Sequence, residues 1–249
     1  MNLGVDERAQ TLERFHGGLV VSCQAAPDHP MRSIDVIGRL AAAAELGGAI
    51  GLRLEGEDDI RHVRERTGLP IIGLKKTRSS IGRPGITRSI DDCLAVAAAG
   101  ADVVALEVVD DADRPLAAAL EMLRIARREL TIPLLADVST SAEASAAMDA
   151  GADAVATTLA GYTPATAHAS VPDFALIESI ASRGIRVIAE GSVTTPADVS
   201  QALAAGAWAV VVGGAITDPL QITARFARAA NAAEATPLHA TTGSRHPLS

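Results

Sequence analysis

Short apolar runs alternate with longer amphipathic segments along most of the chain. The apolar runs are too short for helices and rich in Val, Ile and Leu, which is typical of buried parallel strands. They cover residues 18–22, 49–54, 70–74, 103–106, 133–136, 154–157, 186–189 and 209–212. The pattern predicts helices after them, over 33–46, 57–66, 89–98, 115–128, 141–148, 172–182, 196–204 and 219–230. The chain therefore contains eight predicted strand–helix units.

A repeated segment supports this count. Ala-Gly-Ala or a close variant precedes alternate strands, as at 46–49, 99–101, 150–152 and 205–207. Each glycine is placed to end a helix before an apolar strand, and the spacing of roughly 50 residues corresponds to two strand–helix units. We therefore predict an α/β fold, a single (β/α)8 TIM barrel over 1–230, rather than an open sheet. Residues 1–16 predict a leading helix that closes the bottom of the barrel, and 231–249 a disordered tail.

Composition narrows the class further. A chain of 249 residues has the usual size of one such barrel, and with 2% aromatic residues its core must come from Val, Ile, Leu and Ala. The net charge of −8 and the lack of a basic patch argue against a nucleic-acid partner. No apolar stretch predicts a membrane span or a signal peptide. Cys23 and Cys93 form neither a disulfide framework nor a metal cluster, and we expect reduced thiols in a cytoplasmic protein.

Charged residues stand at four of the predicted strand ends. Strand alternation puts Arg53, Lys76, Asp137 and Glu190 on the same faces as the inward-pointing apolar residues before them. Any one of them alone is better explained by a surface salt bridge. Together, at the carboxyl ends of apolar strands that meet at one mouth of a barrel, they favour an active site. Lys75, the neighbour of Lys76, should face the helices or the rim.

These residues could perform proton transfer. A lysine at a dry strand end can lose its proton, and can then abstract a proton next to a carbonyl or form a Schiff base, with Glu190 as an acid/base partner. Backbone N–H groups at Gly191–Ser192 and Gly213–Gly214 could hold a phosphate, although glycines there could also serve tight turns alone. The loop 157–163 could close over a sugar or form a capped turn. No His or Cys accompanies His29 at ligand spacing, so we expect no metal.

Several segments together resemble a known family. Ser22-Cys23-Gln24, Thr157-Thr158-Leu159-Ala160-Gly161-Tyr162-Thr163 and Ala189-Glu190-Gly191 are specific in combination. Over roughly residues 17–230 the chain resembles the N-acetylmannosamine-6-phosphate 2-epimerase family of sialic-acid catabolism. The resemblance implies a (β/α)8 barrel, and it implies roles for residues of this chain. Lys76 and Glu190 match the catalytic pair, whereas Gln24, Arg53 and Asp137 match substrate-contacting positions, with Thr158 and Tyr162 as further substrate-binding candidates.

The chain departs from the family pattern at a few positions. Thr77 and Ser192 stand where basic residues are usual, and the fourth strand ends in Glu107 instead of Asp. Our hypothesis is a cofactor-independent sugar-phosphate 2-epimerase that interconverts N-acetylmannosamine 6-phosphate and N-acetylglucosamine 6-phosphate by moving the C2 proton. A Schiff-base lyase or aldolase, and a barrel that binds a sugar phosphate without catalysis, are the alternatives. A homodimer is a further expectation.

Overall fold

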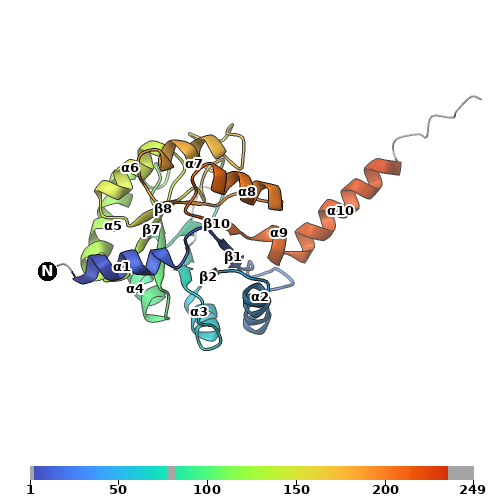
Figure 1. The fold of residues 1–249 in the computed structure, drawn as a ribbon, viewed down its shortest axis with the longest axis horizontal. Helices are drawn as coiled ribbons and strands as arrows, with labels where there is room; N and C mark the ends of the chain where they lie inside the picture. The colour runs from blue at the N-terminus through green and yellow to red at the C-terminus, as the bar shows by residue number, and fades with distance from the viewer. Residues whose placement is uncertain (1–2, 78–81, 235–249) are drawn as a thin grey trace, which may run out of the picture.

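Eight parallel strands close into a barrel in the computed structural model, which describes residues 3–77 and 82–234 (Figure 1). The hydrogen-bonded order around the barrel is β1-β10-β9-β8-β7-β6-β3-β2. The strands are β1 (Leu19–Cys23), β2 (Gly51–Glu55), β3 (Ile71–Leu74), β6 (Val103–Glu107), β7 (Leu134–Asp137), β8 (Ala154–Ala156), β9 (Val187–Ala189) and β10 (Ala209–Val212). The predicted (β/α)8 fold is confirmed, because each apolar run forms one strand of the barrel.

Helices follow the strands and surround the barrel. They are α2 (Ile34–Leu46), α3 (Glu57–Arg64), α4 (Ile90–Ala98), α5 (Leu116–Glu129), α6 (Ser141–Asp149), α7 (Phe174–Ala181) and α8 (Pro196–Ala204). Several begin at side-chain caps that the sequence encodes. Thr140 and Thr195 each start a capping box with an acidic residue three positions later, and Ser89 accepts a hydrogen bond from the Asp92 N–H.

Strand alternation divides the buried residues into two layers. Val20, Ile72, Leu135, Ile188 and their neighbours fill the interior of the barrel. The residues between them point outward and pack against the helices, as Leu52, Leu106, Leu134 and Val210 do. Both faces of every strand are therefore buried, which explains why the strands are continuous apolar runs rather than alternating ones.

The leading helix closes the bottom of the barrel, as predicted. Helix α1 (Leu3–Glu13) places Leu12 and the following Phe15 in the interior cluster, both fully buried. The Trp208 indole donates a hydrogen bond to the Leu12 carbonyl at 3.0 Å, so the end of the helix is tied to the start of β10. Gly51 lacks a side chain where the Phe15 ring lies, because a Cβ there would come within 2.5 Å of the ring. Side chains thus fill one end of the barrel, which leaves the opposite end for an active site.

Two features differ from the predicted pattern. A small antiparallel hairpin, β4 (Lys76–Thr77) with β5 (Gly85–Ile86), follows β3 outside the barrel, in a segment where the apolar pattern predicted no strand. The final helix, α10 (Pro219–Glu234), continues through residues 231–234, so the prediction of a tail from 231 is wrong for these four. Alanine and glutamate are strong helix formers, which favours this continuation. Residues 235–249, the rest of the predicted tail, lie outside the described residues.

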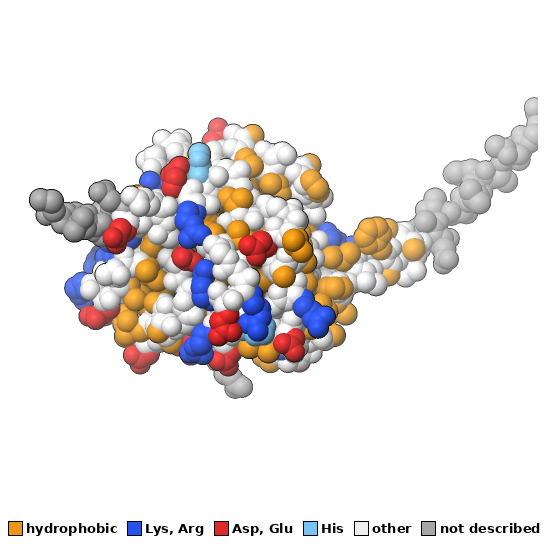
Figure 2. Space-filling model, turned by 60° about the horizontal axis from the view of Figure 1, so that its bottom comes forward, with side chains coloured by type: hydrophobic (Ala, Val, Ile, Leu, Met, Phe, Trp, Pro, Cys, Tyr) orange, Lys and Arg blue, Asp and Glu red, His pale blue; other side chains and the backbone are white. Residues whose placement is uncertain are grey.

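Helix α10 does not cover the barrel as the other helices do. After the short α9 (Gly214–Thr217) it projects away from the body of the molecule (Figure 1). Its apolar side chains are open to solvent, with Leu220 59% and Phe226 74% exposed, and Figure 2 shows hydrophobic groups along this projection. None of the helices in the described part of the chain is both long enough and apolar enough to span a membrane.

Candidate active site

A cavity of about 510 Å³ opens at the carboxyl ends of the barrel strands. Its walls come from the segments that follow β1, β3, β8, β9 and β10, together with the end of β2 and the β4–β5 hairpin. Ten of the residues predicted from the sequence line it: Gln24, Arg53, Lys76, Thr158, Tyr162, Glu190, Gly191, Ser192, Gly213 and Gly214. The structure therefore brings the predicted catalytic, sugar-binding and phosphate-binding groups together in one place.

Arg53 is the centre of the polar network in this cavity. Although only 1% exposed, it donates two hydrogen bonds to Asp137, from Nη1 at 3.1 Å and from Nη2 at 2.7 Å. Its Nη1 also contacts Glu190 Oε2, and the Thr158 hydroxyl donates to Asp137 at 2.6 Å. Asp137 is fully buried behind Arg53 and is not among the residues that line the cavity. Its visible role is to orient Arg53 and Thr158, and its predicted contact with substrate stays a prediction.

Glu190 has an environment suited to a proton-transfer group. Burial raises the pKa of Glu190 to about 7, with Arg53 opposing the rise and the Asp137 carboxylate adding to it. Two carboxylates share one guanidinium, so the second negative charge is costly. The Thr157 hydroxyl bonds both the N–H and the carbonyl of Glu190, at 3.1 and 2.9 Å, which fixes the backbone. Near neutral pH this side chain can therefore donate or accept a proton.

The two adjacent lysines point to opposite sides, as strand alternation predicted. Lys76 lines the cavity, whereas the Lys75 ammonium pairs with Glu57 of α3 at 2.8 Å and Asp92 of α4 at 3.1 Å. The Lys76 side chain reaches solvent through the open mouth, yet the protein around it removes enough water to lower its pKa. The nearby Arg53 charge lowers the pKa of Lys76 further, against the opposing effect of Glu55 and Glu190. Hydrogen bonds to Glu57 and Asp92 instead raise the pKa of Lys75.

The predicted phosphate-binding residues form one wall of the cavity. Gly191 and Ser192 both have positive φ, 107° and 57°, so the chain turns sharply as it leaves β9. Gly213 and Gly214 follow β10 beside them, and a Cβ on Gly214 would lie 2.9 Å from the Gln221 side chain. The cavity-lining residues of this wall include no Lys or Arg in the described part of the chain. Gln221, the first turn of α10, is a polar lining residue that the sequence pattern did not indicate.

Comparison with known proteins identifies the family. A model of the family described as "Putative N-acetylmannosamine-6-phosphate epimerase" matches residues 37–232. The chain belongs to this epimerase family. The described region contains no cluster of three or more His, Cys, Asp or Glu residues that could hold a metal ion.

Individual relatives cover most of the chain. A protein of Caldanaerobacter subterraneus subsp. tengcongensis is 39% identical over 218 residues, which is 86% of this chain and 92% of that protein. One from Escherichia coli O1:K1 / APEC is 40% identical over 203 residues, covering 81% and 86%. Both are described as "Putative N-acetylmannosamine-6-phosphate 2-epimerase". The solved N-acetylmannosamine-6-phosphate 2-epimerase from Clostridium perfringens superimposes with a TM-score of 0.80 at 35% identity, covering 88% of this chain and 95% of that one.

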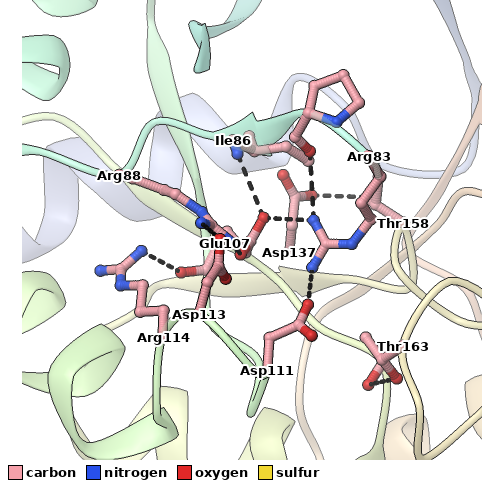
Figure 3. A network of polar contacts seen from close by, with 12 residues as sticks. Arg83, Ile86, Arg88, Glu107, Asp111, Asp113, Arg114, Asp137, Thr158 and Thr163 are labelled. Carbon is pink, nitrogen blue, oxygen red and sulfur yellow. Dashed lines mark hydrogen bonds and ion pairs between the residues drawn. The ribbon is translucent and has the colours of Figure 1, made fainter. Parts of the chain in front are cut away.

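Against this epimerase background, the β4–β5 hairpin is the part of the site that sequence reasoning missed. Arg83, Pro84 and Ile86 from the hairpin segment also line the cavity. Arg83 is held by Glu107 at 2.7 Å and by Asp111 at 2.5 Å (Figure 3). A signal was present, because Glu107 stands where the family usually has Asp. The partners are 24 and 28 residues apart, however, and no spacing rule connects them.

Proposed function

We propose that this protein interconverts N-acetylmannosamine 6-phosphate and N-acetylglucosamine 6-phosphate without a cofactor. The observation that carries this proposal is the pairing of Lys76 and Glu190 in one cavity with pKa values shifted in opposite directions. The pKa of the lysine is lowered and that of the glutamate is raised, so each approaches the range useful at neutral pH. Membership of the epimerase family supports the choice of reaction and substrate.

The chemistry follows from the open-chain form of the sugar. Its C1 aldehyde makes the C2 proton acidic, and the neutral Lys76 amine takes that proton while Glu190 donates a hydrogen bond or a proton to the developing oxyanion. The buried Arg53 would place a permanent positive charge beside this oxygen, which stabilises the developing negative charge. Returning the proton to the same face regenerates the substrate. Delivery to the opposite face, by Glu190 or after rotation of the intermediate, gives the epimer.

The remaining residues of the cavity would bind the substrate. Gln24, Thr158 and Tyr162 offer amide and hydroxyl groups to the sugar and its acetamido group. Backbone N–H groups of Gly191, Ser192, Gly213 and Gly214 would bind the phosphate, because no cationic side chain lines that wall. Asp137 acts behind Arg53 and holds it in place.

The direct test is conversion of the substrate. Purified protein is incubated with N-acetylmannosamine 6-phosphate, and separately with N-acetylglucosamine 6-phosphate, and the anomeric protons are followed by NMR. We expect the same mixture from both directions. Binding of either sugar phosphate without conversion would support a non-catalytic barrel instead.

A Schiff-base lyase or aldolase would use the same lysine differently. In that reaction Lys76 forms a covalent imine with the substrate, and sodium borohydride reduces the imine to a stable amine. We expect the mass of the protein to be unchanged after borohydride treatment in the presence of substrate. A substrate-sized adduct on Lys76 would favour the Schiff-base reaction over epimerisation.

The protein would act as a homodimer in the cytoplasm, in the breakdown of sialic acid. A dimer is supported by α10, which projects with Leu220 and Phe226 exposed and would bury them against a second copy. The free thiols of Cys23 and Cys93 are usual in a reducing compartment. Light scattering should give twice the chain mass for the native protein and a lower mass for Phe226→Glu. A monomeric native protein would contradict the dimer.

A further inference from the structure

Lys76 does not belong to the strands that pair around the barrel. Strand β3 ends at Leu74, and Lys76 lies on β4, where it pairs with Ile86 of β5. The backbone beside it is tied to the same hairpin, because the Thr87 N–H donates to the Lys75 carbonyl at 2.8 Å and the Lys75 N–H donates to the Thr87 hydroxyl at 3.0 Å. The Lys76 N–H also donates to the Glu55 carboxylate of β2 at 3.3 Å, so the position of the Lys76 amine depends on how the segment 85–88 is anchored as well as on this contact with the barrel.

That segment contains a strained residue. Thr87 is fully buried and has φ of 45°, a left-handed conformation that β-branched residues rarely adopt. Such a conformation persists when surrounding contacts impose it. The residues on either side, Ile86 and Arg88, must therefore be held firmly for Thr87 to keep its two bonds to Lys75.

Glu107 holds both of these residues. Its side chain is 1% exposed at the end of β6, and Oε2 accepts hydrogen bonds from the Ile86 N–H at 3.3 Å and from Arg83 at 2.7 Å. Oε1 accepts from Arg88 Nε at 3.1 Å and from Arg88 Nη2 at 2.5 Å (Figure 3). One rigid barrel strand thus binds the hairpin at three residues through one carboxylate. Asp111 and Asp113 bind the outer edges of the two arginines.

We propose that Glu107 is a positioning residue for the proposed epimerisation, since it clamps the hairpin that carries Lys76. The carboxylate does not line the cavity, so it acts through the hairpin and not on the substrate. This inference rests on the proposed function, in which Lys76 moves the C2 proton. It goes beyond that function because it assigns the Glu107 clamp a share in catalysis.

A charge effect of Glu107 on Lys76 can be separated from a positioning effect. The main electrostatic effects on the Lys76 amine come from Glu55, Arg53, Glu190 and Arg32, and Glu107 is not among these four. We therefore expect removal of the Glu107 charge to change the pKa of Lys76 mainly by letting the amine move into water. Looser packing around the amine would raise its pKa toward the ordinary value for lysine.

The test compares Glu107→Gln with the matched control Asp113→Asn. Both variants remove one carboxylate charge from Arg88, but the control leaves every Glu107 contact in place. For Glu107→Gln we expect kcat to fall about 10- to 100-fold, as misplacing a reacting group by about 1 Å can do, with KM within about threefold. The isotope effect with substrate deuterated at C2 should rise, because proton transfer becomes slower relative to the other steps. The control should stay within about twofold of the native enzyme.

A second readout needs no substrate. The pH dependence of Lys76 acetylation by acetic anhydride, followed by mass spectrometry, reports the pKa of the amine, and Lys75 provides an internal reference. In Glu107→Gln, acetylation of Lys76 should begin at a higher pH than in the native protein. Acetylation of Lys75 should begin at a still higher pH in both proteins. If Glu107→Gln does not fold, Arg88→Gln, which removes one arm of the clamp, should show the same changes in smaller degree.

Three outcomes are distinguishable. An unchanged kcat, isotope effect and acetylation profile would overturn the inference. A lower kcat that merely follows a smaller folded fraction, with the isotope effect and the Lys76 profile unchanged, would also overturn it, because the role would be structural. A native protein without epimerase activity would instead refute the proposed function, and the acetylation profile would still decide whether Glu107 positions Lys76.

Discussion

The protonation of Glu190 can be tested by stability measurements without any substrate. Replacing it with Gln keeps the shape of the side chain and removes its titration. The folded protein holds the pKa of Glu190 at about 7 because the carboxyl is buried, against an ordinary value of 4.5 that applies to the unfolded chain. The difference in free energy of unfolding between the wild type and Glu190→Gln therefore isolates the linkage between this one proton and folding.

The sign and size of the effect follow from the shift. A group whose pKa is raised by folding stabilises the protein below its unfolded pKa, and this stability is lost as the pH rises through the folded pKa. Each unit of pKa corresponds to about 1.4 kcal/mol, so a rise from 4.5 to about 7 amounts to roughly 3 kcal/mol. Relative to Glu190→Gln, the free energy of unfolding of the native protein should fall by about this amount between pH 4.5 and 7 and then level off.

Urea unfolding at several pH values and one fixed protein concentration measures this difference. Arg53 and Asp137 are present in both proteins, so their effects appear mainly as an offset that does not change with pH. A difference that is constant with pH would show that the ion pair with Arg53 cancels the effect of burial. A difference that grows in favour of the native protein as the pH rises toward 4.5, and is constant above it, would mean that the ion pair prevails, and Glu190 could not serve as an acid at neutral pH.

The remaining predictions concern the lysines, the phosphate and metal. Lys76→Ala should reduce the activity about 10²- to 10⁴-fold, the usual contribution of a general base. Lys75→Ala should stay near wild type, because the partly exposed ion pairs of Lys75 contribute little. The reverse result in a steady-state assay would show that the assignment of the two lysines to opposite strand faces is wrong. Gly213→Val should raise the KM for substrate by crowding the phosphate. The control is Gly68→Val, at a site where an added Cβ meets no atom within 4 Å. Equal KM values for the two variants would place the phosphate elsewhere. Activity should survive dialysis against EDTA, and loss that one divalent ion restores would contradict a metal-free mechanism.

The barrel and most of the site could be predicted because they depend on local periodicity. Two adjacent lysines on an extended chain must point to opposite faces, so Lys76 and Lys75 could be told apart from the sequence alone. Carboxyl ends of parallel strands must also meet at one mouth, which brought Arg53 and Glu190 together. Neither inference needs information about contacts between distant residues.

Features that depend on distant contacts could not be predicted in this way. The pKa of Glu190 is raised by burial and by Asp137 of β7, against the opposing effect of Arg53 of β2, so it depends on strands distant in the sequence. The clamp by Glu107 joins a barrel strand to a hairpin whose residues follow no period, and the strain at Thr87 is visible only in the backbone angles. The projection of α10 is likewise a matter of packing, because its sequence alone predicts a helix that could equally well have covered the barrel.

Transfer of the C2 proton is the central claim, and exchange with solvent tests it most directly. N-acetylmannosamine 6-phosphate is incubated with the protein in deuterated water, and the C2 position is followed by proton NMR. The mechanism predicts loss of the C2 proton signal in step with formation of N-acetylglucosamine 6-phosphate that carries deuterium at C2, and neither change with Lys76→Ala. A gluco product formed with its original C2 proton fully retained, or a substrate that stays unexchanged in the presence of native protein, would contradict the account.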